Sequence, residues 1–300
     1  MKYLIIIPAV LGMLLAGCAT INSVTEMGAG LAAATGVINA DQAQSITKSV
    51  SAVGKVFESI TPEQEYYIGR TVTATILSKN KPYDNRAMTT YLNTLGQYLS
   101  LFSDRPETFG GYHFLVMDTP DINAFAAPGG FIMVSRGMLR CCKSEEALAG
   151  VLAHEIGHVE LNHGLQAIDK SRLTAAATIL GTEAAKNLGG KDLAELTKTF
   201  ENSISDITST VMNSGYARKF EFQADKAAVT ILMRSGYSPN GLVSMLQQME
   251  KNLKPGGHDF AKTHPAPQDR IAELTKLITT THPADTTARQ ARFDDTMRGL

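Results

Sequence analysis

The chain has 300 residues, 44% of them hydrophobic, and its 28 basic and 29 acidic side chains leave a formal net charge of −1. That balance gives no electrostatic basis for binding nucleic acid or another strongly charged partner, and the length permits one sizeable core. The three cysteines do not form a disulfide framework, because a bridge between the neighbours Cys141 and Cys142 would be strained. We expect these two to be small buried residues, with a redox role as the alternative.

The chain begins with the pattern of a bacterial lipoprotein signal peptide. The apolar run from Leu4 to Leu15 is too short to cross a bilayer, which takes about 20 residues. It ends in Leu-Ala-Gly-Cys, which is typical of a lipobox, so residues 1–17 are predicted to be removed and Cys18 to carry a lipid. The alternative is an ordinary secreted protein in which Cys18 has no special role. Residues 18–40 are rich in Gly, Ala and Thr and are predicted to tether the lipid to a domain at 41–280.

Two helices and three short strands are predicted in the first half of that domain. A capping box at Thr61, followed by a proline, opens a helix that extends to about Ile76. A second helix is predicted from Asp84 to about Leu101. The strands, which we expect to form a small antiparallel sheet beside the next helix, are residues 112–117, 123–127 and 131–134.

The stretch from Leu148 to His163 reads LAGVLAHEIGHVELNH and contains the H-E-x-x-H pattern of zinc hydrolases. Helical residues four apart lie about 40° apart around the axis, so His154 and His158 face the same side and can bind one ion. Glu155 projects from an adjacent part of the helix, where it can accept a proton from a water that zinc activates. The alternative is a buried helix carrying these residues by chance, but burying three unpartnered polar groups would cost several kcal/mol.

A catalytic zinc site needs a third protein ligand, and the chain offers two candidates. The metzincin pattern has a Gly and a His three and six residues after its second His, whereas here Leu161 and His163 stand at three and five. The better candidate is Glu221 in the segment EFQAD, which can complete a His-His-Glu set. Asp225, one helical turn later, can accept the free N–H of a ligand histidine. His163 is then either a neighbour of the site or simply exposed.

The rest of the chain is predicted to be helical apart from its end. Between 193 and 211 apolar residues recur at spacings of three or four, as in an amphipathic helix that either covers the core or serves as a lid. Further helices are predicted around Glu221, after Ser238, and from Pro267 or Gln268 to Leu277. Residues 281–300 are expected to form a loose tail.

These motifs together resemble a known family. HEIGH followed by E-x-x-A-D is similar to the HtpX and CAAX-prenyl-protease-like gluzincin metallopeptidases, and in type to their LoiP/BepA-like periplasmic lipoproteins. The resemblance extends to NAFAAPGG at 123–130, to GFIMVSRGML before the zinc helix, and to the pairs His264-Pro265 and Arg270-Ile271. It covers about residues 60–280. It implies an α+β, mostly helical zincin domain that binds one zinc ion through His154, His158 and Glu221.

The resemblance also implies a function and a location. We expect a zinc endopeptidase that hydrolyses extended or unfolded envelope polypeptides at the periplasmic face of a membrane, anchored by the lipid on Cys18. Ala19 favours the outer membrane, and contact with envelope assembly machinery is a further expectation. In gluzincins an exposed edge strand near the zinc takes the substrate as an extra strand. The alternative is a chaperone or assembly factor that binds chains with little turnover. The candidates for the substrate edge are Asn123, Ala124, Phe125, Ala126 and Ala127.

His264 and Arg270 are the remaining candidates for a catalytic role. The transition state of hydrolysis carries an oxyanion, and a donor directed at it contributes about 3–4 kcal/mol. His264, stiffened by the following proline, is the best candidate for that donor, or it approaches the zinc and occludes the open position. The structural alternative is that Arg270 pairs with an acid and His264 caps its loop.

Overall fold

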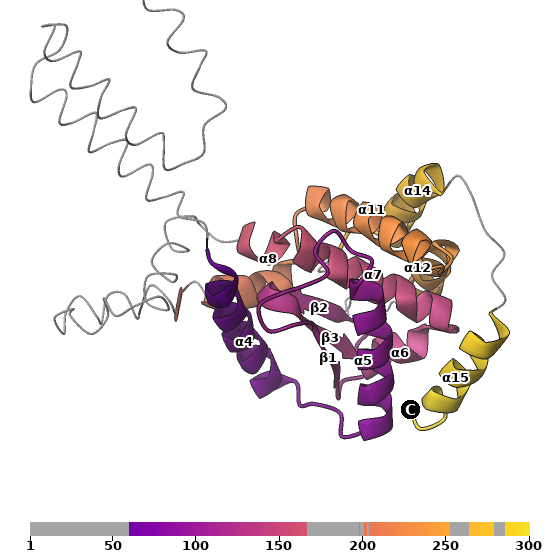
Figure 1. Cartoon of the computed structure of the whole chain (residues 1–300), viewed down its shortest axis with the longest axis horizontal. Helices are drawn as coiled ribbons and strands as arrows, with labels where there is room; N and C mark the ends of the chain where they lie inside the picture. The colour runs from indigo at the N-terminus through magenta and orange to yellow at the C-terminus, as the bar shows by residue number, and fades with distance from the viewer. Residues whose placement is uncertain (1–59, 167–197, 199–200, 203, 253–263, 279–285) are drawn as a thin grey trace, which may run out of the picture. The chain divides into compact units, whose positions relative to one another are not determined.

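The structure is a computed structural model that describes residues 60–166, 198, 201–202, 204–252, 264–278 and 286–300 (Figure 1). The predictions for the signal peptide, Cys18, the tether and residues 167–197 lie outside this range. No helix within the described residues is both long and apolar enough to cross a membrane.

The helices are α4 (Pro62–Lys79), α5 (Arg86–Ser100), α6 (Arg136–Cys141), α7 (Glu145–Glu160), α8 (His163–Gln166), α11 (Arg218–Arg234), α12 (Asn240–Asn252), α14 (Pro267–Leu277) and α15 (Thr287–Met297). The strands are β1 (His113–Met117), β2 (Ala124–Ala127) and β3 (Phe131–Ser135), with a short turn η2 (Pro128–Gly130) and a π-helical turn η4 (Thr210–Ser214).

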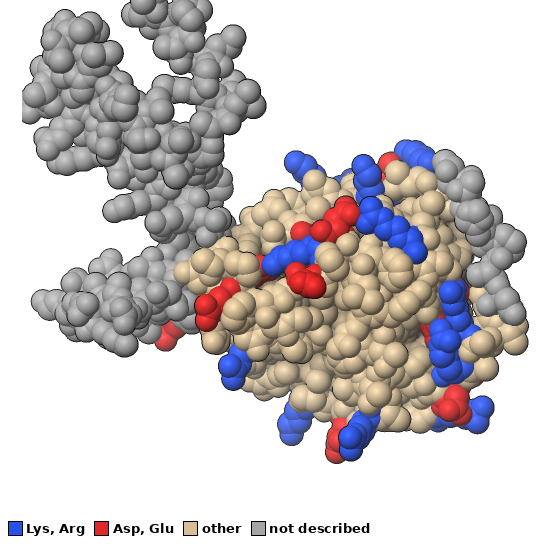
Figure 2. Space-filling view, viewed as in Figure 1, with Lys and Arg blue, Asp and Glu red and all other residues tan. Residues whose placement is uncertain are grey.

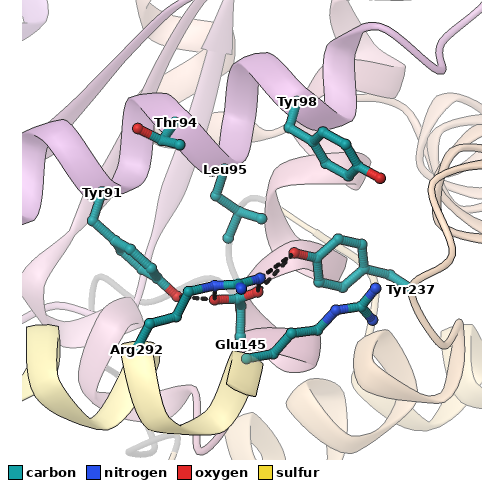
Figure 3. A pocket seen from close by; sticks show the side chains of 8 residues that line it. Tyr91, Thr94, Leu95, Tyr98, Glu145, Tyr237 and Arg292 are labelled. Carbon is teal, nitrogen blue, oxygen red and sulfur yellow. Dashed lines mark hydrogen bonds and ion pairs between the residues drawn. The ribbon is translucent and has the colours of Figure 1, made fainter. Parts of the chain in front are cut away.

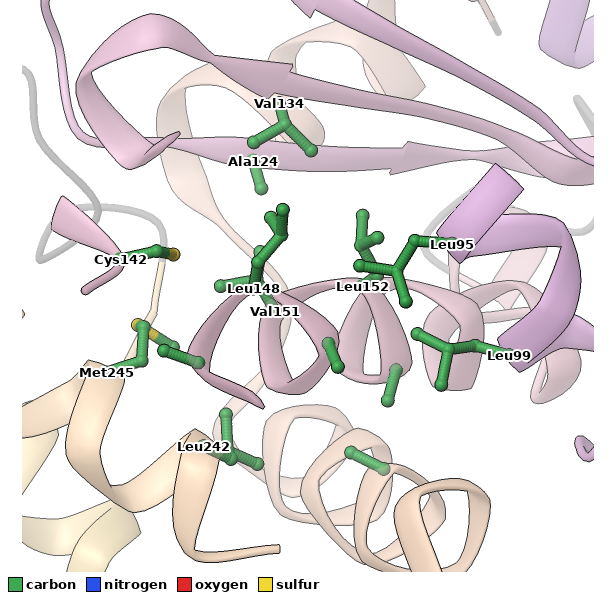
Figure 4. Packing of buried hydrophobic residues seen from close by; sticks show 14 of the residues in the cluster. Leu95, Leu99, Ala124, Val134, Cys142, Leu148, Val151, Leu152, Leu242 and Met245 are labelled. Carbon is green, nitrogen blue, oxygen red and sulfur yellow. The ribbon is translucent and has the colours of Figure 1, made fainter. Parts of the chain in front are cut away.

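Helix α7 lies at the centre of the domain, between the sheet and a pair of helices (Figure 4). Its side chains Leu148 and Leu152 face Ala124 and Val134 of the sheet, and its opposite side packs against α11 and α12. All residues from Glu145 to Val159 are buried. A helix that is enclosed on all sides must be apolar all round, which is the pattern of LAGVLA before the first histidine.

Glycine allows the close packing of α7 on α12. A Cβ atom at Gly150 would lie 2.7 Å from the Cα atom of Leu242. That distance is shorter than any van der Waals contact, so any larger residue at position 150 would push the two helices apart.

The sheet has the strand order β1-β3-β2 and is mixed. β2 and β3 pair antiparallel, with Ala124 opposite Val134, whereas β1 and β3 pair parallel, with His113 opposite Phe131. The prediction of a purely antiparallel sheet is therefore wrong for β1. The tight η2 turn joins β2 and β3 as a hairpin, so these two strands run in opposite directions. Because β3 lies between β1 and β2, β1 pairs with the strand of the hairpin that runs parallel to it.

The predicted helix ends agree well with the structure where a capping signal marks them. The Thr61 side chain accepts from the backbone N–H of Gln64, and Gln64 accepts in return, so the capping box is formed. α14 begins at Pro267, as predicted. α5 begins at Arg86, two residues after the predicted start at Asp84, because Asn85 is the residue whose side chain caps it.

The end of the chain differs from the expected loose tail, because residues 287–297 form the packed helix α15. Phe293 is only 4% exposed and joins the main core. The Arg292 guanidinium pairs with the buried carboxylate of Glu145, which also accepts from the hydroxyls of Tyr91 and Tyr237 (Figure 3). These four side chains line a cavity of about 410 Å³. Phe293 and Arg292, together with the ion pair between Arg289 and Glu146, therefore dock a segment whose hydrophobic pattern was too sparse to predict.

The surface of the described residues carries both charge signs. On the face shown in Figure 2, basic and acidic side chains are interspersed over a largely uncharged surface. The acidic and basic residues therefore do not separate into large fields on this face.

Candidate metal centre

His154 and His158 project from the C-terminal half of α7 toward one point. Their Nε2 atoms are 3.2 Å apart, and both residues are almost fully buried. The helix that holds them is capped at its start by Ser144, whose side chain accepts from the N–H of Ala147. The prediction that i, i+4 spacing brings both imidazoles to the same side is confirmed.

Glu221 reaches the histidines from α11, which packs directly on α7. Its Oε2 lies 3.4 Å from Nε2 of His154 and its Oε1 lies 3.5 Å from Nε2 of His158. The close approach depends on Gly157, because a Cβ atom there would lie 2.9 Å from the carbonyl oxygen of Ala224. The glycine of HEIGH therefore has a packing role that the motif alone does not reveal.

His264 joins the cluster from the segment just before α14. Its Nδ1 lies 2.5 Å from Oε2 of Glu221, and the residue is buried. One ligand atom from each of His154, His158, Glu221 and His264 falls within 4.8 Å of every other, which makes this a group that could hold a metal ion. The structure thus places His264 beside the predicted ligands, as required for either role proposed for it.

The residues fit a zinc ion by their own chemistry. Two imidazole Nε2 atoms face each other at 3.2 Å, and neutral histidines offer lone pairs there when the proton is on Nδ1. Within the described residues, Oε1 of Glu221 and Oε1 of Glu155 are buried without a hydrogen-bond partner. A cation at the point where these atoms converge would bind Oε1 of Glu221 and the two facing Nε2 atoms. Nitrogen and carboxylate donors in a His-His-Glu set are those typical of catalytic zinc.

The carboxylates of the site have opposite electrostatic environments. Burial raises the pKa of Glu155 to about 7, against the opposing effect of the neighbouring His154. Burial would also raise the pKa of Glu221, but His264 and His158 outweigh it and hold that pKa well below its usual range. Glu221 is therefore charged, as a ligand must be, whereas Glu155 is poised to exchange a proton near neutral pH.

Asp225 and Arg270 lie on the far side of the His154 ring. Oδ1 of Asp225 is 2.9 Å from Nδ1 of His154, the geometry expected for a carboxylate that orients a ligand. Arg270, which is fully buried, donates to Asp225 from Nε at 2.9 Å and from Nη2 at 2.5 Å. Nη2 of Arg270 also lies 3.1 Å from Nδ1 of His154, so Arg270 contacts the ring at the nitrogen that does not face the cluster. The pairing with an acid, given above as the structural alternative, is what the structure shows.

Two ring side chains contact His158: Tyr216, which the sequence did not single out, and His163, for which the sequence left open a place beside the site or an exposed one. The Tyr216 ring stacks on the imidazole, with centroids 4.4 Å apart and planes at 22°. Its hydroxyl donates to the carbonyl oxygen of Ala126 at 3.0 Å. On another side of the imidazole, Nδ1 of His163 lies 2.9 Å from Nδ1 of His158. Tyr216 lies in no recognisable motif, so nothing in the sequence singled it out.

The strand predicted as the substrate edge is at an edge of the sheet. Among the described strands β2 pairs with β3 alone, and one face of it contacts α7. Asn123 lies just before the strand, and its backbone N–H donates to the hydroxyl of Ser135. The four residues of β2 are buried, and η4 and the Tyr216 hydroxyl contact the strand. The strand is therefore an edge of the sheet without being open to solvent along its length.

Cys141 and Cys142 lie at the end of α6, and both are buried free thiols. Burial raises the pKa of each above the ordinary thiol value. Thiolates are the reactive form, so this environment suits a packing role and gives no support to a redox one.

Comparison with known sequences decides the family. Residues 86–278, more than half of the chain, match the profile described as Peptidase family M48. The chain belongs to this family. The matched region contains α7, α11, the whole of α14 and the segment before α14 that carries His264. Every residue of the candidate site therefore lies within the part of the chain that matches the M48 family.

Several curated M48 relatives are similar over much of this chain. The beta-barrel assembly-enhancing protease of Yersinia pestis is 28% identical over 222 residues, which is 71% of this chain and 43% of that protein. The metalloprotease LoiP of Escherichia coli is 27% identical over 201 residues, 67% of this chain and 73% of LoiP. The mitochondrial metalloendopeptidase OMA1 of Schizosaccharomyces pombe is 28% identical over 169 residues, 54% of this chain and 45% of OMA1. The chain spans less than half the length of the first and third of these.

Proposed function

We propose that the chain is a zinc metalloendopeptidase whose site is formed by α7 and α11. The single observation that carries this is the convergence of His154, His158 and Glu221, with Glu155 buried beside them. Membership of the M48 family and the protease names of its relatives support the same activity. A chaperone that binds chains with little turnover is not favoured, because the complete set of residues for hydrolysis is present.

In the proposed reaction the protein supplies ligands, a base and the positioning of both. His154, His158 and Glu221 would hold the ion, which supplies Lewis-acid chemistry that makes water a nucleophile at neutral pH. Glu155 takes the proton of the attacking water and returns it to the leaving amine. Asp225 holds His154 in the tautomer that leaves Nε2 free, and Arg270 holds Asp225. Arg270 is therefore proposed as a positioning residue in place of the catalytic role expected from the sequence.

His264 has two possible roles in this site, and both follow from its position beside Glu221. As a donor to the oxyanion it would stabilise the transition state. As a further ligand it would fill the position that substrate needs. The proximity of the four ligand atoms is compatible with both roles, and the effect of His264→Ala on turnover distinguishes them.

The substrate class follows from the edge strand. A polypeptide that adds to β2 in an extended conformation would displace the Tyr216 hydroxyl from Ala126 and lie beside α7, the helix that carries Glu155. We therefore propose extended or unfolded polypeptides as substrates, bound at Ala124 to Ala127 with Asn123 at the end. The name of the Yersinia relative supports envelope proteins and their assembly machinery as the partners. The lipobox supports an anchor through Cys18 at the periplasmic face of the outer membrane.

Metal content and turnover, measured on the same preparation, test the proposal. The purified full-length chain should contain about one zinc per chain. It should hydrolyse casein, lose this activity to a chelator and recover it on addition of zinc. Glu155→Gln should keep the zinc and lose turnover by a factor of about 10²–10⁴. Wild-type protein without zinc, or a Glu155→Gln variant as active as wild type, would show that the proposal is wrong.

A further inference from the structure

His163 is a buried side chain that contacts one of the proposed ligands and that the reaction above does not use. It is 1% exposed, and its Nδ1 lies 2.9 Å from Nδ1 of His158. Its ring stacks on Phe220, with centroids 4.5 Å apart and planes at 16°. The side chain of Gln223 also hydrogen-bonds to the ring. Side chains from α7 and α11 therefore fix the orientation of this imidazole.

The backbone directs His163 toward the site. Among the described residues other than glycine, Asn162 alone has a positive φ, 54°. Asparagine tolerates this left-handed conformation better than most residues, and here it reverses the chain directly after α7. Arg105 donates to the Asn162 side chain at 2.6 Å and to the carbonyl oxygen of Val159 at 3.3 Å. The turn that returns His163 to the helix is thus held by specific contacts.

The pair of facing nitrogens allows only one proton arrangement that suits a metal. A hydrogen bond between two Nδ1 atoms needs one proton, so one ring donates and the other accepts. His158 can bind a cation through Nε2 only if Nε2 carries no proton, which puts its proton on Nδ1. His163 must then accept at Nδ1 and carry its own proton on Nε2, the nitrogen left for Gln223.

We infer that His163 is a positioning residue that holds His158 in its metal-binding tautomer, as Asp225 does for His154. This rests on the proposed zinc site. The two ligands then have different partners, a carboxylate behind His154 and a neutral imidazole behind His158. A neutral acceptor orients the ring without adding a further carboxylate to a site that already contains Glu221, Glu155 and Asp225.

Two substitutions separate the hydrogen bond from the packing. His163→Phe keeps a ring to stack on Phe220 but has no acceptor for His158. His163→Asn loses the ring but keeps an acceptor, because Oδ1 of asparagine, like Nδ1 of histidine, is bonded to Cγ. Zinc affinity is measured on full-length proteins by competition with a chromophoric chelator, with the apoprotein melting temperature as the check on folding. We expect the dissociation constant to rise roughly 10- to 100-fold in His163→Phe and to stay near wild type in His163→Asn.

The outcomes distinguish this inference from the proposed function. If wild type binds zinc and His163→Phe binds it equally well, or if both variants lose affinity equally, His163 does not act through the hydrogen bond. If wild type binds no zinc, the proposed function itself is wrong. A direct measurement does not depend on the variants folding: nitrogen NMR of zinc-loaded wild type should show His158 protonated on Nδ1 and His163 on Nε2. A His163 protonated on Nδ1 would overturn the inference.

Discussion

Arg270 binds both carboxylate oxygens of Asp225, and the same carboxylate contacts Nδ1 of His154 at 2.9 Å. All three side chains are buried, and they come from three helices or their borders, α14, α11 and α7. A buried carboxylate needs a partner, so the guanidinium keeps Asp225 charged and directed at the histidine. The link between α14 and the zinc helix is therefore electrostatic as well as steric.

The first prediction follows from this link. Asp225→Asn should weaken zinc affinity roughly 10- to 100-fold. Arg270→Met should do the same and also destabilise the fold by about 3–5 kcal/mol, because it leaves a buried carboxylate unpaired. Chelator competition and urea unfolding measure the two effects. If Arg270 instead had a direct catalytic role, Arg270→Lys would keep wild-type zinc affinity and stability and would lose turnover.

The second prediction concerns His264. If its ring donates to the oxyanion, His264→Ala should keep zinc and lower kcat by a factor of about 10²–10³. If it occupies the open position instead, the same variant should be more active than wild type. Zinc content and peptide turnover, measured together, separate the two. Unchanged turnover with unchanged zinc would exclude both and leave His264 a structural role.

The third prediction concerns the Tyr216 hydroxyl, which donates a hydrogen bond to the carbonyl oxygen of Ala126 on β2. An added substrate strand would need that acceptor, so Tyr216→Phe should lower KM by about 2- to 10-fold, the value of one hydrogen bond. The aromatic ring on His158 remains, so zinc affinity should not change. Tyr112→Phe is the matched control, because its hydroxyl donates to Arg105 instead. A KM that does not move, or that moves equally in both variants, would argue against β2 as the substrate edge.

The fourth prediction concerns the anchor. Cys18→Ser should abolish labelling with a radioactive fatty acid in cells and leave the protein either unprocessed or released from the membrane fraction. The peptidase activity of the purified variant should equal that of wild type, because residue 18 lies far along the chain from the metal ligands. Mass spectrometry that finds an unmodified Cys18 in the mature wild-type protein would contradict the lipid anchor.

The fifth prediction tests the docking of α15. Phe293→Ala should destabilise the protein by about 3–5 kcal/mol, as expected for removal of a buried aromatic side chain. Arg298→Ala, directly after the end of the same helix and exposed, should have almost no effect. Equal unfolding free energies for the two variants would mean that the tail is loose, as the sequence had suggested.

The sequence alone determined the elements whose signals are local. The capping box at Thr61, the proline before α14 and the i, i+4 histidines act through residues within one or two turns, so their outcome could be predicted. The EFQAD segment also supplied Glu221 and Asp225, because both must lie on one helix and share a side. The zinc-site prediction thus needed only helical geometry and the chemistry of the ligands.

Only the tertiary structure decided the contacts between segments distant in the chain. The parallel pairing of β1 with β3 depends on which strand of the β2–β3 hairpin lies next to β1, and no strand pattern in the sequence reveals that. The partners of Arg270, His163 and Tyr216 come from other helices or strands. Helix α15 likewise docks on distant segments through Phe293 and through the ion pairs of Arg289 and Arg292. The physical reason is the same in each case: a buried polar group selects its partner by distance in space, and that distance exists only after the core has formed.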